Sequence, residues 1–469
     1  MKNRLGTTAT PVSPEGPCLI CWVNKLIRAV DSGAYTPSNV LIGALHRNPA
    51  HWMEQEKKNR LYSALPSGDE QRREQVLRRY LEAMVDVEVR ARRCYINDGS
   101  IINDSEAFAC MLLLDGYFVL SSLELTGIGM AGRSSDLYDR DVIFLLENQL
   151  PFFVLEDIYG LLAAEGGNDD GAIINNADDV AQDAASYIER LVLHHHLYVH
   201  NTVTYRTVRA NLNGRPPCHL LHLLYLYFWP TTIGRRRAQT ETNGSLTAAA
   251  AVAHAAVELN ITVDTAAAVP AVATQSRWRS ATYYYAAGVR LAKRELDGGE
   301  ACSILDIDVR DGTLHIPCLR IDGNTTTILR NMMALELHSH EPGVGTHVRA
   351  YCHFLSMVAS TEEDVRLLSS KGIIDHSLGN DSDVADGFAG LCRGVPINLS
   401  DPELYYLKRE QEELEKLCRS HWRKSMAWLR HTKCNNILMA LAVAAAVILF
   451  LCTVLQSLFA ALSYATRKS

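Results

Sequence analysis

The sequence has 469 residues, of which 48% are hydrophobic and 21% are charged, and its formal net charge is −7. An acidic chain without a dominant basic face is not expected to bind nucleic acid, which attracts clustered lysine and arginine. The 12 cysteines are scattered, so we expect reduced, mostly buried thiols and no disulfide framework of the kind found in short secreted proteins. The length alone suggests two or three folding units.

The first third of the chain is expected to be helical. Residues 1–17 are polar and predict a flexible N-terminus, and a helical body is expected over 18–433. Within 18–164, apolar residues recur at three- and four-residue spacing with charges between them, as in EQVLRRYLEAMVDVEVRARRCY, which predicts amphipathic helices. Residues 165–182 are rich in Asp, Asn and Gly and predict an acidic surface loop before the next helix.

The middle of the chain changes character twice. Residues 234–276 are rich in Ala and Thr and predict a low-complexity insertion rather than a domain boundary. Residues 302–321 alternate on both sides of Asp311-Gly312, which predicts a β-hairpin. Helical patterns then resume. The expected fold class is therefore mainly α: a multi-helix globular body with one small β-hairpin, followed by a C-terminal transmembrane helix.

The C-terminal region predicts a membrane anchor. Residues 437–462 contain no charged residue and are long enough to cross a hydrocarbon core of about 30 Å. The alternative, a buried core helix, rarely runs so long without a polar face. The predicted span includes Ile437, Leu449 and Leu462, leaves a short tail at 463–469, and indicates a single-pass, tail-anchored protein.

The charges beside this span predict its orientation. Lys and Arg are concentrated before the span, and only Arg467 and Lys468 follow it. The positive-inside rule then favours a cytoplasmic body at the plasma membrane or an endomembrane. Six N-x-S/T sequons favour the opposite orientation, because they matter only in a lumenal or extracellular body. Cys434 is either a site for reversible palmitoylation or an ordinary thiol.

Three patterns resemble reactive sites but lack the expected context. GIGMAG at 127–132 matches a dinucleotide fingerprint, yet no strand precedes it and no βαβ alternation surrounds it. His196 and His200 are spaced as zinc ligands on a helix, and His219 and His222 form a second pair, yet the spacing offers no third ligand. We therefore interpret these residues as an interhelical turn and as surface or interfacial histidines, and we expect no metal, no cofactor and no catalytic residue.

The stretch ENQLPFFVLEDIY places Pro151 inside an apolar helical pattern. Proline lacks an N–H and its ring clashes with the carbonyl four residues earlier, so the helix must kink or restart. Buried backbone groups freed in this way cost about 1–3 kcal/mol each if they stay unpaired. The side chains just upstream can satisfy them, so we interpret four residues as a structural kink: Glu147, Asn148, Gln149 and Pro151. The alternative makes Glu147 a catalytic acid or base.

The longer stretch DLYDRDVIFLLENQLPFFVLEDIY resembles the hallmark of the plant domain-of-unknown-function 247 family (DUF247, UPF0481-like). AYTPSNVLIGALHRN, MEQEKKNRLY, FACMLLLDGYFVL, CHLLHLLYL and EDVRLLSSKGII are similar to further family segments, in the family's order. Departures at Ala44-Leu45 and His222 suggest a diverged copy. The resemblance implies a mostly helical plant protein with one C-terminal span and no known catalytic activity. Some members in grasses are linked to self-incompatibility recognition.

These observations together favour a non-enzymatic, membrane-tethered protein that recognises or scaffolds an unidentified protein partner. The polar loops at 165–182 and 234–276 are either contact surfaces or plain disordered insertions. The rival hypothesis is an enzyme of unknown type that uses Glu147 as acid or base. Glu147→Gln discriminates between them, because it keeps the shape and removes the charge.

Overall fold

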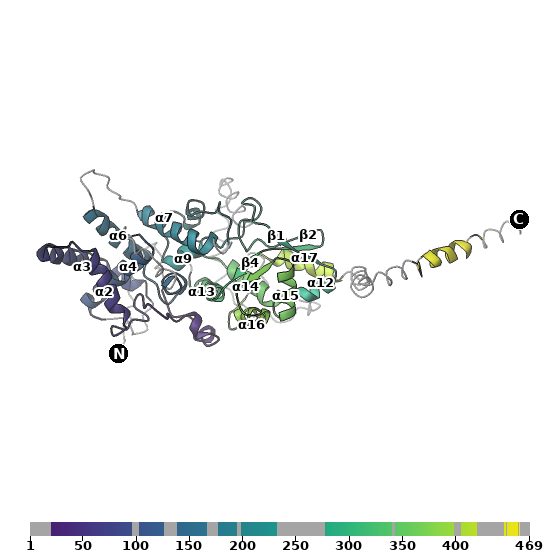
Figure 1. The fold of residues 1–469 in the computed structure, drawn as a ribbon, viewed down its shortest axis with the longest axis horizontal. Coiled ribbons are helices and arrows are strands. Elements are labelled where there is room, and N and C mark those ends of the chain that lie inside the picture. Colours follow the sequence, from purple (N-terminus) through teal and green to yellow (C-terminus); the bar gives the residue numbers. More distant parts are fainter. Residues whose placement is uncertain are drawn as a thin grey trace, which may run out of the picture.

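The computed structural model describes residues 20–95, 103–125, 138–166, 177–194, 198–231, 277–339, 343–397, 405–419, 445–446, 448–457 and 459. Within these ranges the body is mainly helical, as the sequence predicts, and it contains two small sheets where the sequence predicts a single hairpin (Figure 1). Four parts of the predictions lie outside the described residues: residues 1–17, the GIGMAG motif at 127–132, the insertion at 234–276 and the tail at 463–469. Of the acidic loop predicted over 165–182, positions 167–176 also lie outside them. The ends of that prediction are wrong, because residues 165–166 end one helix and residues 177–182 begin the next.

Twelve helical elements are described before the insertion. They are α1 (Lys25–Arg28), η1 (Ser32–Ala34), α2 (Met53–Ala64), α3 (Glu70–Arg93), α4 (Ser105–Ser122), η2 (Arg140–Phe144), α6 (Phe152–Gly166), α7 (Ala177–Ile188), η3 (Glu189–His194), α8 (Tyr205–Val208), η4 (Arg209–Leu212) and α9 (Leu220–Tyr225). In both η2 and η3 the backbone is π-helical, a rare form that occurs mostly as single turns inside α-helices.

Side-chain caps fix where the two longest of these helices begin. Asp69 accepts hydrogen bonds from two backbone N–H groups at the start of α3, and Asp104 does the same for α4. Helix α4 is apolar on all sides and is long enough to cross a membrane, but 78% of its most apolar window is buried in the body. Such burial is typical of a core helix, which agrees with the interior position that its composition predicts.

After the insertion the chain alternates between helices and short strands. The elements are α12 (Ala281–Ala286), β1 (Arg290–Arg294), β2 (Asp308–Arg310), β3 (Thr313–Pro317), β4 (Leu319–Ile321), α13 (Thr325–His338), α14 (His347–Val358), α15 (Glu362–Ser370), β5 (Ile374–His376), α16 (Asp381–Leu391) and α17 (Lys408–Arg419).

The strands form two small sheets. Strands β2 and β3 pair antiparallel around Asp311-Gly312, where the sequence predicts a hairpin. Both turn residues have positive φ, 51° and 71°, as a two-residue hairpin turn of the primed type requires. Strand β1 pairs parallel with β3, and β4 pairs parallel with β5 in a separate sheet. These two parallel pairings were not predicted, because neither short strand carries a distinctive pattern of its own.

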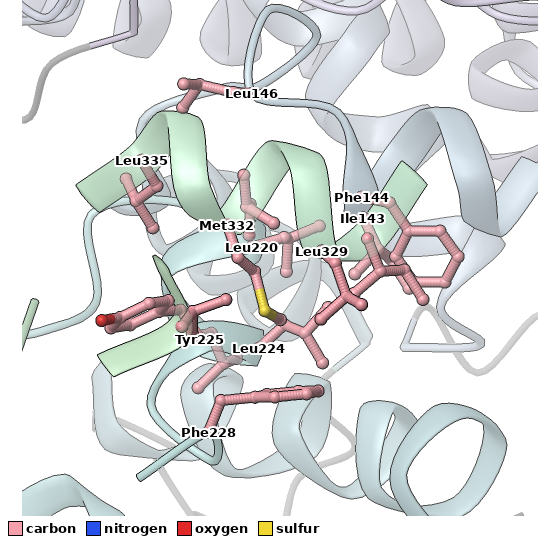
Figure 2. Close-up of a cluster of buried hydrophobic side chains, with 14 of the residues drawn as sticks. Ile143, Phe144, Leu146, Leu220, Leu224, Tyr225, Phe228, Leu329, Met332 and Leu335 are labelled. Carbon is pink, nitrogen blue, oxygen red and sulfur yellow. The ribbon is translucent and has the colours of Figure 1, made fainter. Parts of the chain in front are cut away.

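One hydrophobic cluster joins the segments on both sides of the insertion. Helix α13 lies in its centre, and Figure 2 shows side chains of α13 close to side chains of η2 and α9: Leu329, Met332, Leu335, Ile143, Phe144, Leu220 and Leu224. The described body therefore has a continuous core.

The predicted membrane span is only partly described. Of residues 437–462, the structure describes 445–446, the helix Ile448–Ser457 and residue 459, whereas Ile437 and Leu462 lie outside the described residues. The helix Ile448–Ser457 is apolar but shorter than a bilayer requires, and it stands apart from the body in Figure 1. Its apolar side chains are exposed, and Leu449 is 67% accessible.

Candidate functional site

The stretch around Pro151 is not one kinked helix but two elements with a break between them. Element η2 ends at Phe144, residues 145–151 are non-helical, and α6 starts at Phe152. Pro151 therefore immediately precedes the first helical residue, a place where a missing N–H costs nothing because the first amides of a helix have no partner within it. The helix restarts at the proline.

Gln149 provides hydrogen-bond donors for the backbone carbonyls at the end of η2. Its side-chain amide donates to the carbonyls of Val142, Ile143 and Leu145 at 3.2, 3.4 and 3.0 Å. Its side-chain oxygen accepts from the backbone N–H of Leu221 at 3.3 Å, in α9. Gln149 is only 1% exposed, so water does not reach these carbonyls to pair with them. The side chain therefore provides the hydrogen bonds that the carbonyls lose where the helix ends.

Asn148 connects the same break to the N-terminal segment, which we define as residues 20–46. Its oxygen accepts from the N–H of Ile42 at 2.8 Å, and its amide donates to the carbonyls of Val40 at 3.0 Å and Asp141 at 2.9 Å. The side chain is fully buried. The side-chain amide of Asn148 thus makes hydrogen bonds to backbone N–H and C=O groups more than 100 positions away.

Glu147 has partners different from those the sequence suggested. It does not cap neighbouring helical turns. Instead its carboxylate accepts from the N–H of Val23 at 2.9 Å, contacts the Arg28 guanidinium, and lies 2.9 Å from Nε2 of His46. All three partners belong to the N-terminal segment, so the fully buried acid binds that segment to the body.

Two further buried carboxylates hold the N-terminal segment. Asp141 accepts from three consecutive backbone N–H groups, those of Ser38, Asn39 and Val40, at 2.6–3.1 Å. Asp115, in α4, accepts from the N–H of Gly43 at 2.9 Å. Consecutive amides that converge on a carboxylate form a favourable anion-binding arrangement, here filled by the protein itself.

Lys57 balances the charge of Asp115. Its ammonium lies 2.6 Å from Asp115 and 2.6 Å from Glu54, and it donates to the carbonyl of Leu41 at 2.5 Å. Burial raises the pKa of Asp115 and opposes ionisation of Lys57, but the two acids raise the pKa of Lys57 above its ordinary value. The lysine is therefore a charged structural donor rather than a nucleophile.

Asn331 is a buried contributor that the sequence analysis missed. From α13 it accepts from the N–H of Leu146 at 2.9 Å and donates to the carbonyls of Ala34 at 2.7 Å and Thr327 at 2.9 Å. An asparagine within the apolar stretch LRNMMALE is the signal that could have revealed it, because a fully buried amide needs partners. Together with Asp115, Asp141, Glu147, Asn148 and Gln149 it forms what we call the central polar cluster.

The central polar cluster contains no activated nucleophile among the described residues. Burial and the charge of Glu147 raise the pKa of the neighbouring Cys21 thiol to about 11, which opposes thiolate formation. Each oxygen of Glu147 is engaged by donors that fix the fold. Within the described ranges, no group of three His, Cys, Asp or Glu side chains lies close enough to hold a metal ion.

The predicted histidine pairs lie in different environments. His219 and His222 are buried in α9 and its cap, where Nδ1 of His219 accepts from the N–H of His222 at 3.1 Å. Burial lowers the pKa of His219 to about 3. His200 contacts Thr202 at 2.9 Å, and His196 and Cys434 lie outside the described residues. His219 and His222 are therefore core residues rather than the surface or interfacial histidines that we expected.

Glu336, a further buried carboxylate, caps a helix in the C-terminal half of the chain. Glu336, in α13, accepts from the N–H groups of Val348 and Arg349 at 2.8 and 2.9 Å, at the start of α14. It also accepts from the hydroxyl of Tyr225 at 2.6 Å and from Nε of Arg349 at 3.2 Å. Burial raises the pKa of Glu336 to about 7 against the effect of these donors.

Comparison with known proteins places the chain among plant sequences. The chain is 25% identical over 468 residues to the UPF0481 protein At3g47200 of Arabidopsis thaliana. The alignment covers 96% of this chain and 88% of that protein. A second UPF0481 protein of the same plant, At3g02645, is 27% identical over 155 residues, 33% of this chain and 28% of its own. No solved structure matches the chain. The family model described as a plant protein of unknown function, DUF247, matches residues 20–452, which include the central polar cluster and Glu336. This chain therefore belongs to the plant DUF247 family.

Proposed function

We propose that this chain is a non-enzymatic, membrane-tethered protein whose helical body recognises or scaffolds another protein. The observation that carries the proposal is a contrast between two regions. The side chains of the central polar cluster are buried and hydrogen-bonded within the body, whereas the apolar helix Ile448–Ser457 is exposed. A buried, paired polar cluster stabilises a scaffold, and an exposed apolar helix needs a lipid or protein environment.

The membrane part of the proposal is supported by the sequence around that helix. Residues 437–462 lack any charge over a length that can cross a bilayer, and basic residues precede them. The exposed side chains Ile448, Leu449, Phe450, Leu451 and Phe459 belong to this segment. We expect the body to lie on the cytoplasmic side of a plasma or endomembrane.

The non-enzymatic part is supported by the contacts of Glu147. A catalytic acid or base must reach substrate, and this carboxylate is 0% exposed and is engaged by Val23, Arg28 and His46. These contacts give Glu147 a role in holding the N-terminal segment to the body, without any role in catalysis. The body then offers surfaces for a partner, in the way that rigid helical scaffolds generally do.

Protease protection on intact vesicles tests the membrane tether and its orientation. The full chain carries a different tag at each terminus, and a chain truncated after residue 436 is the matched control. We expect the full chain to resist carbonate extraction, its N-terminal tag to be digested from outside the vesicles, and its C-terminal tag to be protected. The truncated chain should remain in the soluble fraction. Extraction of the full chain by carbonate would refute the tether, and a protected, glycosidase-sensitive body would reverse the orientation.

A further inference from the structure

The solvent-facing side of α3 carries a short, self-complementary sequence of charges. Val85 and Val89 are 45% and 59% exposed, and Glu82 and Arg93 are exposed on either side of them along the helix. Steps of three, four and four residues place all four side chains on one stripe. The buried residues of α3, Val76, Tyr80, Met84, Glu88 and Ala91, lie on the opposite side.

The end charges of this stripe lack ionic partners in the part of the chain that the structure describes. The ion pairs of α3 there involve other residues: Glu70 with Arg73, Glu74 with Arg78, Arg79 with Glu165, and Glu88 with Arg92. Arg90 lies over the ring of Phe153, 3.7 Å from its centre, and so is directed toward α6. Among the described residues, therefore, no ion pair of Glu82 or Arg93 competes with a docking partner.

We propose that this stripe is a docking surface for α3 of a second copy of the chain, packed antiparallel. In that arrangement Val85 of one copy faces Val89 of the other, because these residues lie equally far from the midpoint between them. Glu82 and Arg93 lie five and six residues from the same midpoint, so each acid meets the base of the other copy. Such a two-fold contact uses the same patch on both copies.

The charge order selects this occupant and this direction. A parallel pair would place Glu82 against Glu82 and Arg93 against Arg93, which costs free energy. The four residues of the stripe read acid-apolar-apolar-base, which matches the same order read in reverse. The exposed Asp86 lies beside the stripe near its midpoint and meets Asp86 of the other copy at the rim, where solvent screens the repulsion. Figure 1 shows α3 at the end of the body opposite α12, α15 and α17. The proposal does not depend on the membrane tether.

The contact is small, so we expect weak, concentration-dependent association that decreases with added salt. Charge reversal gives a sharp test with the full chain in detergent micelles, measured by sedimentation equilibrium. Glu82→Lys alone and Arg93→Glu alone each oppose like charges and should weaken association by about tenfold. An equimolar mixture of the two variants should recover it, because the new lysine meets the new glutamate and native Arg93 meets native Glu82.

Two controls separate docking from folding. Arg72→Glu reverses a charge on α3 outside the stripe and should leave association unchanged, and thermal melts of each variant show whether the helix is intact. The double variant Glu82→Lys/Arg93→Glu should associate as the wild type does. The proposal is wrong if the wild type stays monomeric at high concentration, or if the mixture associates no better than the separate variants. Association that persists in both single variants places the contact elsewhere and also overturns it.

Discussion

At the scale of single residues, the central polar cluster depends on amides with more than one partner. Asn148 makes hydrogen bonds to Ile42, Val40 and Asp141, and all of them are buried. Asn148→Ala leaves one N–H and two carbonyls without partners in a region from which water is excluded. Since each unpaired buried group costs about 1–3 kcal/mol, we expect a loss of about 3–5 kcal/mol in the free energy of unfolding.

Chemical denaturation of the purified chain measures this change. The control is Asn59→Ala in α2, because Asn59 is exposed and pairs only with Gln55 at 3.0 Å in the described structure. We expect that control to change the free energy of unfolding by less than about 0.5 kcal/mol. Equal effects of the two substitutions would show that Asn148 does not bind the N-terminal segment.

Gly43 shows how closely the N-terminal segment approaches the break before α6. It has a φ of +70°, and an added Cβ would lie 2.4 Å from the carbonyl oxygen of Gln149 and 2.6 Å from the hydroxyl of Tyr95. Gly43→Ala therefore combines backbone strain with a collision against a backbone atom, and we expect the melting temperature to fall by about 10 °C or more.

Gly68 provides the matched control for this prediction. Its φ is +94°, but no atom lies within 4 Å of the added Cβ. Gly68→Ala should therefore add only backbone strain, about 1–2 kcal/mol. Differential scanning fluorimetry compares the two variants. If both melt at the same temperature, the close approach of Gly43 contributes nothing to stability.

At the scale of elements, the packing of α13 on α14 is expected to depend on pH. Glu336 caps α14 from α13, and its pKa is raised from its ordinary value of 4.5 to about 7 because the carboxyl is buried. The folded state therefore favours the protonated form. The stability from this effect is complete below pH 4.5 and is lost as the pH rises through about 7.

The difference in free energy of unfolding between wild type and Glu336→Gln isolates this effect. We expect the wild type to lose stability relative to the variant between pH 4.5 and 7. Burial lowers the pKa of His219 and His347 to about 3, so these residues destabilise the fold as the pH falls, but they are common to both chains and cancel in the difference. A difference that stays constant with pH would contradict the assignment. Replacing the carboxyl group by an amide also changes the free energy of unfolding by an amount that does not depend on pH. That amount shifts the difference between the two chains but not its slope against pH.

At the scale of the whole molecule, the segments on either side of the insertion are anchored close to one another. Before it, Thr231 donates through its N–H and its hydroxyl to Asp306 at 2.7 and 2.5 Å. After it, the fully buried Trp278 donates to the hydroxyl of Tyr405. The adjacent Tyr406 donates to the carbonyl of Leu305 at 2.8 Å, which brings the two anchors together.

We therefore expect removal of residues 234–276 to leave the body folded. A Gly/Ser linker of about twelve residues spans about 20 Å on average and replaces the deleted segment. The melting temperature should stay within about 2 °C of the wild type, because loop length affects stability only weakly. A longer deletion that also removes Trp278 is the control and should melt much lower. Equal melting of both deletions would argue against these anchors.

Local features of the fold were predictable because they depend on neighbouring residues. Asp311-Gly312 specifies a hairpin turn, Pro151 specifies a helix start, and the apolar spacing of α3 specifies its buried side. Gln149 donates to carbonyls only four to seven positions away, so this contact too depends on neighbouring residues. In each case the residue that gives the signal and the backbone that responds to it lie within a few positions of each other in the sequence.

Tertiary structure alone decided which distant groups meet. The sequence shows that Glu147 requires partners, but Val23, Arg28 and His46 lie more than 100 positions away, and nothing local selects them. Asn331 and Leu146 are likewise 185 positions apart, and no local pattern selects the pairing of β1 with β3. A buried polar group is stable only with its hydrogen bonds complete, so the sequence determined that these side chains would be paired. The packing of one shared core determined which partners each side chain meets. It placed the partners of Glu147 in the N-terminal segment and so gave Glu147 a structural position.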